Sequence, residues 1–181
     1  VNSEVMRSMA VDRESKYPTK LQNNWLDLFR GLETLRFAPM MEKAKGNFKA
    51  PAFTWYPQTQ FCYMRDKGAF LATKGGNNNE SHNHNDVGTC TLYFDNMPIL
   101  IDAGVGTYTR QTFSSERYSI WTMQSQYHNL PVINGIQQKF GAEYKASNVK
   151  ATKSKDSFSA DISTAYPEEA KVRSWVRSYK L

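Results

Sequence analysis

The chain has 181 residues, which suits one domain, or one domain with part of another. Hydrophobic residues make up 40% of it, enough for a core, so disorder throughout is excluded; no apolar run reaches the roughly 20 residues of a membrane helix. The net charge of +6 suits an anionic partner, with an ordinary solvated surface as the alternative, and the scattered basic residues argue against nucleic acid.

The first 45 residues have the pattern of a helix. Large apolar side chains recur every three to four residues, at Leu21, Trp25, Leu28, Phe29, Leu32 and Leu35. Pro39 is predicted to end this pattern. One amphipathic helix cannot bury its apolar face alone. We therefore expect this helix to lie on the rest of the chain or on a part that is missing, with residues 1–48 as a helical remnant or linker.

From about residue 50 the pattern changes to short strands. Expected strands are residues 59–65, 69–74, 89–94, 98–102, 130–134, 150–153, 158–164 and 172–179, with turns at residues 66–68 and 95–96. Residues 114–126 form either a short helix or an irregular crossing. Many short strands between turn signals predict a mainly β protein with an antiparallel β-sandwich over residues 49–181. Its last strand still runs at Leu181, so we expect a truncated C-terminus.

The two cysteines, Cys62 and Cys90, are too few for a disulfide framework. Both lie in apolar, strand-like surroundings, so buried free thiols are expected. One bridge between them is the alternative.

The three histidines, His82, His84 and His128, are the strongest chemical signal. In an extended segment His82 and His84 would face one side, and Asp86 would join them. Two imidazoles with a carboxylate suit a zinc-type site. Asp102 ends an apolar strand, where a carboxylate needs a metal or a histidine as partner. The alternative is three unrelated histidines.

Three sequence blocks, residues 74–88, 100–108 and 127–135, resemble the β-sandwich domain of heparinase II/III-like polysaccharide lyases in order and spacing. The resemblance covers residue 51 to the C-terminus. It implies an α/α toroid before the sandwich, of which residues 1–48 would be the last helical piece. The family's catalytic tyrosine and the residue that neutralises the substrate carboxylate lie in the missing toroid, so we expect this piece alone to be inactive.

The resemblance also implies roles for individual residues. His84, Asp102 and His128 match the metal ligands, usually of zinc, and His82 matches a catalytic histidine that faces the cleft. The reaction would be β-elimination on a uronic acid of a heparan-type or alginate-type polysaccharide, in the bacterial periplasm or outside the cell. Candidates for substrate binding are Lys74, Tyr108, Arg110, Arg117 and Asn134. For Lys74, Arg110 and Arg117 the alternative is that each is an ordinary surface charge.

Two other functions are weighed against a lyase. One is a metal-stabilised sandwich that binds carbohydrate without cleaving it. The other is a cupin-type metal enzyme, which also uses two histidines two residues apart. A cupin normally adds a glutamate a few residues later, whereas the next candidate ligand here is Asp102, and this favours the lyase pattern.

Overall fold

The computed structural model describes residues 50–181 and, before them, residues 28–29, 32, 36, 39–40 and 43. The chain divides into two units, Val1–Ala50 and Pro51–Leu181. In the first unit the described residues before Ala50 are helical, Pro39 included; the rest of the predicted apolar face lies outside the described residues. No described helix is long and apolar enough to span a membrane.

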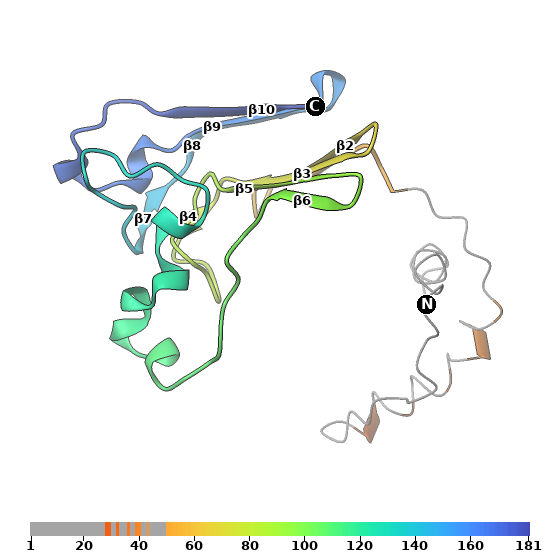
Figure 1. Cartoon of the computed structure of the whole chain (residues 1–181), viewed down its shortest axis with the longest axis horizontal. Coiled ribbons are helices and arrows are strands. Elements are labelled where there is room, and N and C mark those ends of the chain that lie inside the picture. Colours follow the sequence, from red (N-terminus) through yellow and green to blue (C-terminus); the bar gives the residue numbers. More distant parts are fainter. Residues whose placement is uncertain (1–27, 30–31, 33–35, 37–38, 41–42, 44–49) are drawn as a thin grey trace. The chain divides into compact units, whose positions relative to one another are not determined.

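The second unit begins with a five-stranded antiparallel sheet in the order β1-β2-β3-β5-β6 (Figure 1). Its strands are β1 Phe53–Tyr56, β2 Phe61–Asp66, β3 Ala69–Lys74, β5 Cys90–Phe94 and β6 Met97–Leu100. Both predicted tight turns are confirmed. Lys67 and Gly68 between β2 and β3, and Asp95 and Asn96 between β5 and β6, all have positive φ, as a two-residue hairpin turn requires.

Three later strands form a second sheet in the order β10-β9-β8, with β8 Ser147–Thr152, β9 Ser157–Asp161 and β10 Val176–Lys180. Figure 1 shows this sheet lying over the first one. Their facing sides share one core, in which Cys62, Met64 and Leu71 of the first sheet meet Phe158 and Ala160 of β9. The predicted antiparallel β-sandwich is confirmed.

Shorter elements join the two sheets. A pair of strands, β4 Asn77–Asn78 and β7 Gly141–Lys145, lies beside them. The uncertain stretch around residues 114–126 is a chain of 3-10 turns. The 3-10 helices are η2 Gln111–Phe113, η3 Ser115–Ser119, η4 Trp121–Met123, η5 Ser125–Tyr127, η6 Lys153–Lys155, η7 Ser163–Ala165 and η8 Glu168–Ala170.

One predicted strand, residues 130–134, is wrong. Only an isolated bridge between Ile133 and Ile136 forms there. Pro131 lacks the N–H that a strand ladder needs, and Asn134 and Gly135 turn the chain with positive φ. Conversely, β1, β4 and β7 were not predicted as separate strands; β4 lies in a loop of glycine and asparagine, which are depleted in strands.

The cysteines are free and buried. Thr73 of β3 pairs with Cys62 of β2 on one side and with Cys90 of β5 on the other. The two cysteines are therefore two strand spacings apart, about 10 Å, which exceeds the reach of a disulfide. The bridge between them is excluded by this register.

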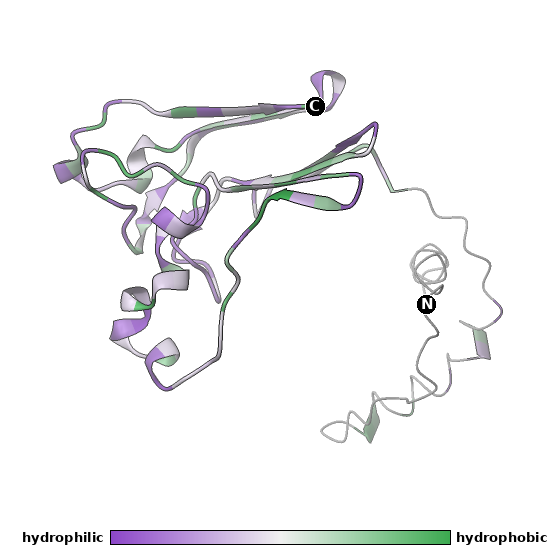
Figure 2. Ribbon diagram, in the orientation of Figure 1, coloured by the Kyte–Doolittle hydropathy of each residue, from purple (hydrophilic) through white to green (hydrophobic). Residues whose placement is uncertain are grey.

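The edge strand β6 exposes its apolar side chains. Met97 and Ile99 are 66% and 57% exposed, and Ile101 just after the strand is 58% exposed. Figure 2 shows this strand as a hydrophobic stretch of ribbon. Among the described strands, β6 pairs only with β5.

Asp161 at the end of β9 ties the second sheet together. Its buried carboxylate accepts hydrogen bonds from the backbone N–H groups of Ser163 and Trp175 at 2.9 and 3.1 Å, and from the Ser174 hydroxyl at 2.9 Å. Burial acts to raise the pKa of Asp161, but these donors outweigh it and lower the pKa to about 2.

Replacing Asp161 with asparagine is therefore expected to lower the free energy of unfolding by about 2 kcal/mol at neutral pH. The pKa is lower in the folded than in the unfolded state, so the charge stabilises the fold above about pH 4. This stabilisation is lost as the pH falls towards 2. Urea unfolding at several pH values measures it, with exposed Glu169→Gln as the control; a difference between Asp161→Asn and wild type that does not shrink in acid contradicts this explanation.

Candidate functional site

The candidate site is built around a long hairpin connection, residues 75–89, which we call the histidine loop. It joins β3 to β5, two strands that pair directly. Backbone hydrogen bonds close its base: Gly88 donates to the Lys74 carbonyl at 3.0 Å, and Gly75 donates to the Gln60 carbonyl at 2.9 Å. The sheet therefore fixes where the loop begins and ends.

His82 and His84 do not follow the extended spacing predicted for them. His82 has φ of 57° and lies in a turn with Ser81, so the backbone reverses there. His82 is exposed, while His84 is half-buried. Asp86 does not join them in a cluster; it binds Lys74 instead.

Three segments bring the predicted metal ligands together. His84 comes from the histidine loop, Asp102 follows β6, and His128 follows η5; one ligand atom of each lies within 4.8 Å of the others. Nδ1 of His128 lies 2.6 Å from Asp102 Oδ2, and Nε2 lies 2.9 Å from the Thr122 carbonyl oxygen. A carbonyl oxygen only accepts, so Nε2 carries a proton and Nδ1 is the atom that faces Asp102.

The electrostatics of this cluster favour the protonation states that metal ligands need at His84 and Asp102, but not at His128. Burial and the neighbouring His128 lower the pKa of His84, which favours the neutral imidazole. Burial acts to raise the pKa of Asp102, but the His128 hydrogen bond and the Gly104 N–H outweigh it, so the pKa is lowered. For His128, burial acts to lower the pKa, but the hydrogen bond and charge of Asp102 raise it.

Asn129 aligns Asp102 with His128. Its side-chain amide donates to the Ile101 carbonyl at 2.8 Å and to the Cys90 carbonyl at 3.0 Å, and its own φ is 57°. Adjacent residues of one segment, His128 and Asn129, thus contact adjacent residues of the other, Asp102 and Ile101. This places the carboxylate beside the imidazole.

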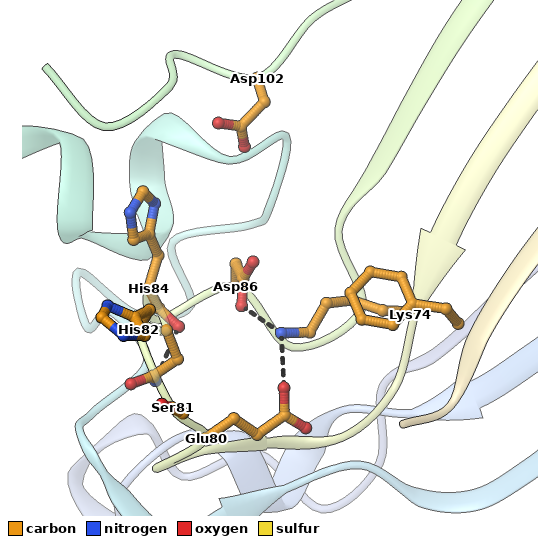
Figure 3. A pocket seen from close by; sticks show the side chains of 9 residues that line it. Lys74, Glu80, Ser81, His82, His84, Asp86 and Asp102 are labelled. Carbon is orange, nitrogen blue, oxygen red and sulfur yellow. Dashed lines mark hydrogen bonds and ion pairs between the residues drawn. The ribbon is translucent and has the colours of Figure 1, made fainter. Parts of the chain in front are cut away.

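An open pocket of about 330 Å³ lies against the histidine loop (Figure 3). His82, His84 and Asp102 line it on one side, and Lys74 and Phe61 line it from the sheet. Glu80, Ser81, Asn83 and Asp86 complete the lining. The predicted catalytic histidine and two of the predicted metal ligands therefore share one pocket.

Lys74 lies in the pocket, but its charge is already matched. Its side chain is buried, with Nζ 2.8 Å from Asp86 Oδ1 and 3.3 Å from Glu80 Oε2. Burial acts to lower the pKa of Lys74, but the two carboxylates outweigh it and the pKa is raised. Lys74 is thus a buried cation with two partners, which was not among the alternatives expected from the sequence.

Arg117 supports the loop from outside the pocket. Its guanidinium donates to the Asn83 carbonyl at 3.0 Å and to the Thr112 carbonyl at 2.9 Å. The Tyr118 hydroxyl donates to Asn83 Oδ1 at 2.9 Å. These contacts fix the residue between the two loop histidines.

The remaining predicted substrate residues do not line the pocket. Tyr108 is 51% exposed and stacks on Phe113, with ring centroids 5.7 Å apart. Arg110 precedes η2 and is exposed. Asn134 lies in the turn after Ile133, where its side chain donates to the Ala170 carbonyl at 2.8 Å.

With this geometry established, comparison with known proteins decides the family. The model of the family described as heparinase II/III-like, C-terminal, matches residues 49–178, most of the chain. The chain belongs to this family. None of the curated proteins compared with the chain matches it.

Two solved structures of heparan sulfate lyase HepC from Pedobacter heparinus share the fold. A mutant form is 16% identical, with a TM-score of 0.54, and the match covers 98% of this chain and 26% of that one. A second structure is 16% identical, with a TM-score of 0.50 and coverage of 89% and 23%. The present chain thus spans about a quarter of the length of the chain in either structure. The assignment of residues 1–48 to a toroid stays a prediction.

Sequence reasoning missed several residues of this heparinase II/III-like site. They are Phe61 and Glu80 in the pocket, Tyr118 and Asn129 beside it, and the Thr122 carbonyl that orients His128. In the sequence, Lys74 is followed by acidic residues six and twelve positions later. Many exposed loops have the same spacing, so it does not indicate a buried lysine. No sequence signal separates these residues from ordinary polar positions.

Proposed function

We propose that the protein containing this chain is a polysaccharide lyase that cleaves uronic-acid-containing acidic polysaccharide, of the heparan or alginate type, by β-elimination. Membership of the heparinase II/III-like family supports the enzyme class. The single observation that carries the proposal is the pocket in which exposed His82 stands beside His84 and Asp102. The net charge of +6 suits an anionic polymer.

His82 is the proposed catalytic residue within this chain. In β-elimination the C5–H bond and the C4–O bond of the uronate break, a C4=C5 double bond forms, and the leaving oxygen takes up a proton. An imidazole can accept or donate a proton near neutral pH, so His82 serves as the base or as a proton relay. The turn at Ser81 and His82 presents the ring at the pocket, where it makes no hydrogen bond to the described residues.

The proposed cofactor is zinc, held by His84, Asp102 and His128. The donor set fits: Nε2 of His128 donates to a carbonyl oxygen, as the second nitrogen of a ligating histidine usually does, and leaves Nδ1 as the ligand atom. The lowered pKa values of His84 and Asp102 favour their ligating forms. When bound, the ion would add positive charge beside Asp102 and hold the histidine loop to the segments that carry Asp102 and His128.

A cupin-type enzyme fits the geometry less well. In that alternative both histidines of the pair His82 and His84 would bind the same ion. His84 lies with Asp102 and His128, whereas His82 is not part of that group. The two histidines therefore have different proposed roles.

The missing parts of the site are proposed to lie in an N-terminal toroid of the whole protein, which would supply a tyrosine and the group that neutralises the uronate carboxylate. The proposed location is the bacterial periplasm or the cell exterior. For the isolated chain, which lacks those groups, no turnover is expected.

Incubation of the whole protein with heparan sulfate, heparin and alginate tests the function. We expect products that absorb ultraviolet light through the new C4=C5 double bond, and none with the isolated chain. Binding of the polymers without cleavage would support the carbohydrate-binding alternative. Cleavage by the chain alone would contradict the proposed division of the site between two domains.

A further inference from the structure

Lys74 connects the sheet to both sides of the histidine loop. It is the last residue of β3, and its side chain is 5% exposed. Nζ reaches Asp86 at 2.8 Å and Glu80 at 3.3 Å, two carboxylates that precede and follow the segment with His82 and His84 (Figure 3). One buried ammonium therefore closes the chain segment 80–86 into an arc.

Both acidic residues are themselves held in place. Glu80 Oε1 accepts the Asn77 N–H at 3.3 Å, and the backbone N–H of Asp86 donates to Asn78 Oδ1 at 3.2 Å. The backbone carbonyl of Lys74 also accepts the Gly88 N–H at 3.0 Å. Each end of the arc therefore contacts Lys74 and one further part of the loop.

These contacts leave little of Lys74 for a substrate. A buried ammonium that faces two carboxylates has no net positive charge to offer an incoming uronate or sulfate. The ring of Phe61, with its centroid 5.6 Å from Nζ, covers it further. Removing the ammonium would leave two carboxylates facing each other in the pocket wall, and their repulsion would push the loop outward.

We propose that Lys74 is a positioning residue, which holds the histidine loop so that His82 and His84 keep their places at the pocket, and that it does not bind the substrate anion. This inference rests on the proposed lyase function and deepens it. It assigns Lys74 to the turnover step rather than to substrate affinity. A displacement of about 1 Å in a catalytic group is enough to lower turnover by as much as about 100-fold.

The test compares Lys74→Met with wild type in the whole protein, with Lys155→Met, an exposed lysine in η6, as the control. We expect kcat to fall at least about 10-fold with KM changed less than about 2-fold. We also expect amide hydrogen exchange across residues 76–88 to speed up at least about 10-fold. A KM that rises 10-fold with kcat unchanged, the behaviour of a substrate anchor, overturns the proposal.

A second variant and a second readout keep the outcomes distinct. If Lys74→Met does not fold, Glu80→Gln removes one partner of the ammonium more gently; we expect kcat about 3-fold lower at constant KM, and unchanged kcat and exchange overturn the proposal. If wild-type protein cleaves none of the polysaccharides, the proposed function fails. Amide hydrogen exchange then tests the positioning role of Lys74 by itself. Equal protection of the histidine loop from exchange in Lys74→Met and in wild type refutes that role.

Discussion

Replacing His82 with alanine is expected to lower the lyase kcat of the whole protein by about 100-fold to 10,000-fold, the usual contribution of one positioned acid–base group. The expected change in stability is small, because the side chain is exposed and makes no hydrogen bond to the described residues. Initial rates of double-bond formation, together with thermal unfolding of both proteins, measure the two quantities.

His82→Asn is the matched variant for this experiment. Asparagine tolerates the left-handed φ of 57° better than alanine does, and it can form hydrogen bonds but cannot exchange a proton near neutral pH. We expect it to be as inactive as His82→Ala. Recovery of activity in His82→Asn would mean that residue 82 only binds substrate, and a kcat within 3-fold of wild type in both variants would remove His82 from the chemistry.

Loss of any one predicted ligand is expected to weaken zinc binding by more than about 100-fold, since even the loss of an outer partner of a ligand costs up to that much. The variants are His84→Ala, Asp102→Asn and His128→Ala, and His82→Ala is the control that should keep its zinc. His84→Ala is the cleanest of them, because His128 is fully buried and its loss also leaves a cavity. Elemental analysis and titration with zinc measure the stoichiometry and the affinity.

The pH dependence of zinc binding has a predicted direction. Without metal, His128 Nδ1 and Asp102 Oδ2 share a hydrogen bond of 2.6 Å, and the raised pKa of His128 favours its cation. Zinc has to displace that proton, so affinity should rise with pH until His128 is neutral.

Zinc at 100 times its Kd should add about 2.7 kcal/mol to the free energy of unfolding, and chelation of the zinc should remove this stabilisation. Equal zinc content in wild type and all three ligand variants would refute the assigned site.

The sequence predicted those parts of the sandwich that depend on short-range signals, such as tight turns between neighbouring strands. The turns at residues 66–68 and 95–96 set the hairpins, and β3 has the predicted bounds Ala69–Lys74. The prediction failed at residues 130–134, where apolar side chains serve a second core cluster around Val87 and Ile162 rather than a strand. Apolar content alone does not distinguish these two environments.

The sequence likewise predicted some features of the candidate site and missed others. His84, Asp102 and His128 were named from the sequence and do come together, although their meeting depends on contacts such as Asn129 to Ile101, which link distant segments. The extended geometry assumed for His82 was wrong because a turn with positive φ intervenes. Lys74 and Arg117 were named for their charge, but their partners, Asp86 and the Asn83 carbonyl, come from tertiary contacts that spacing does not reveal.

The closed base of the histidine loop bears on how members of this family diversify. Because β3 and β5 are neighbours in the sheet, the residues between them can lengthen, shorten or change without altering the strand register. Changes in this loop that keep the contacts of Lys74 with Glu80 and Asp86, and the pairing of β4 with β7, can therefore alter the shape of the pocket on an unchanged sheet.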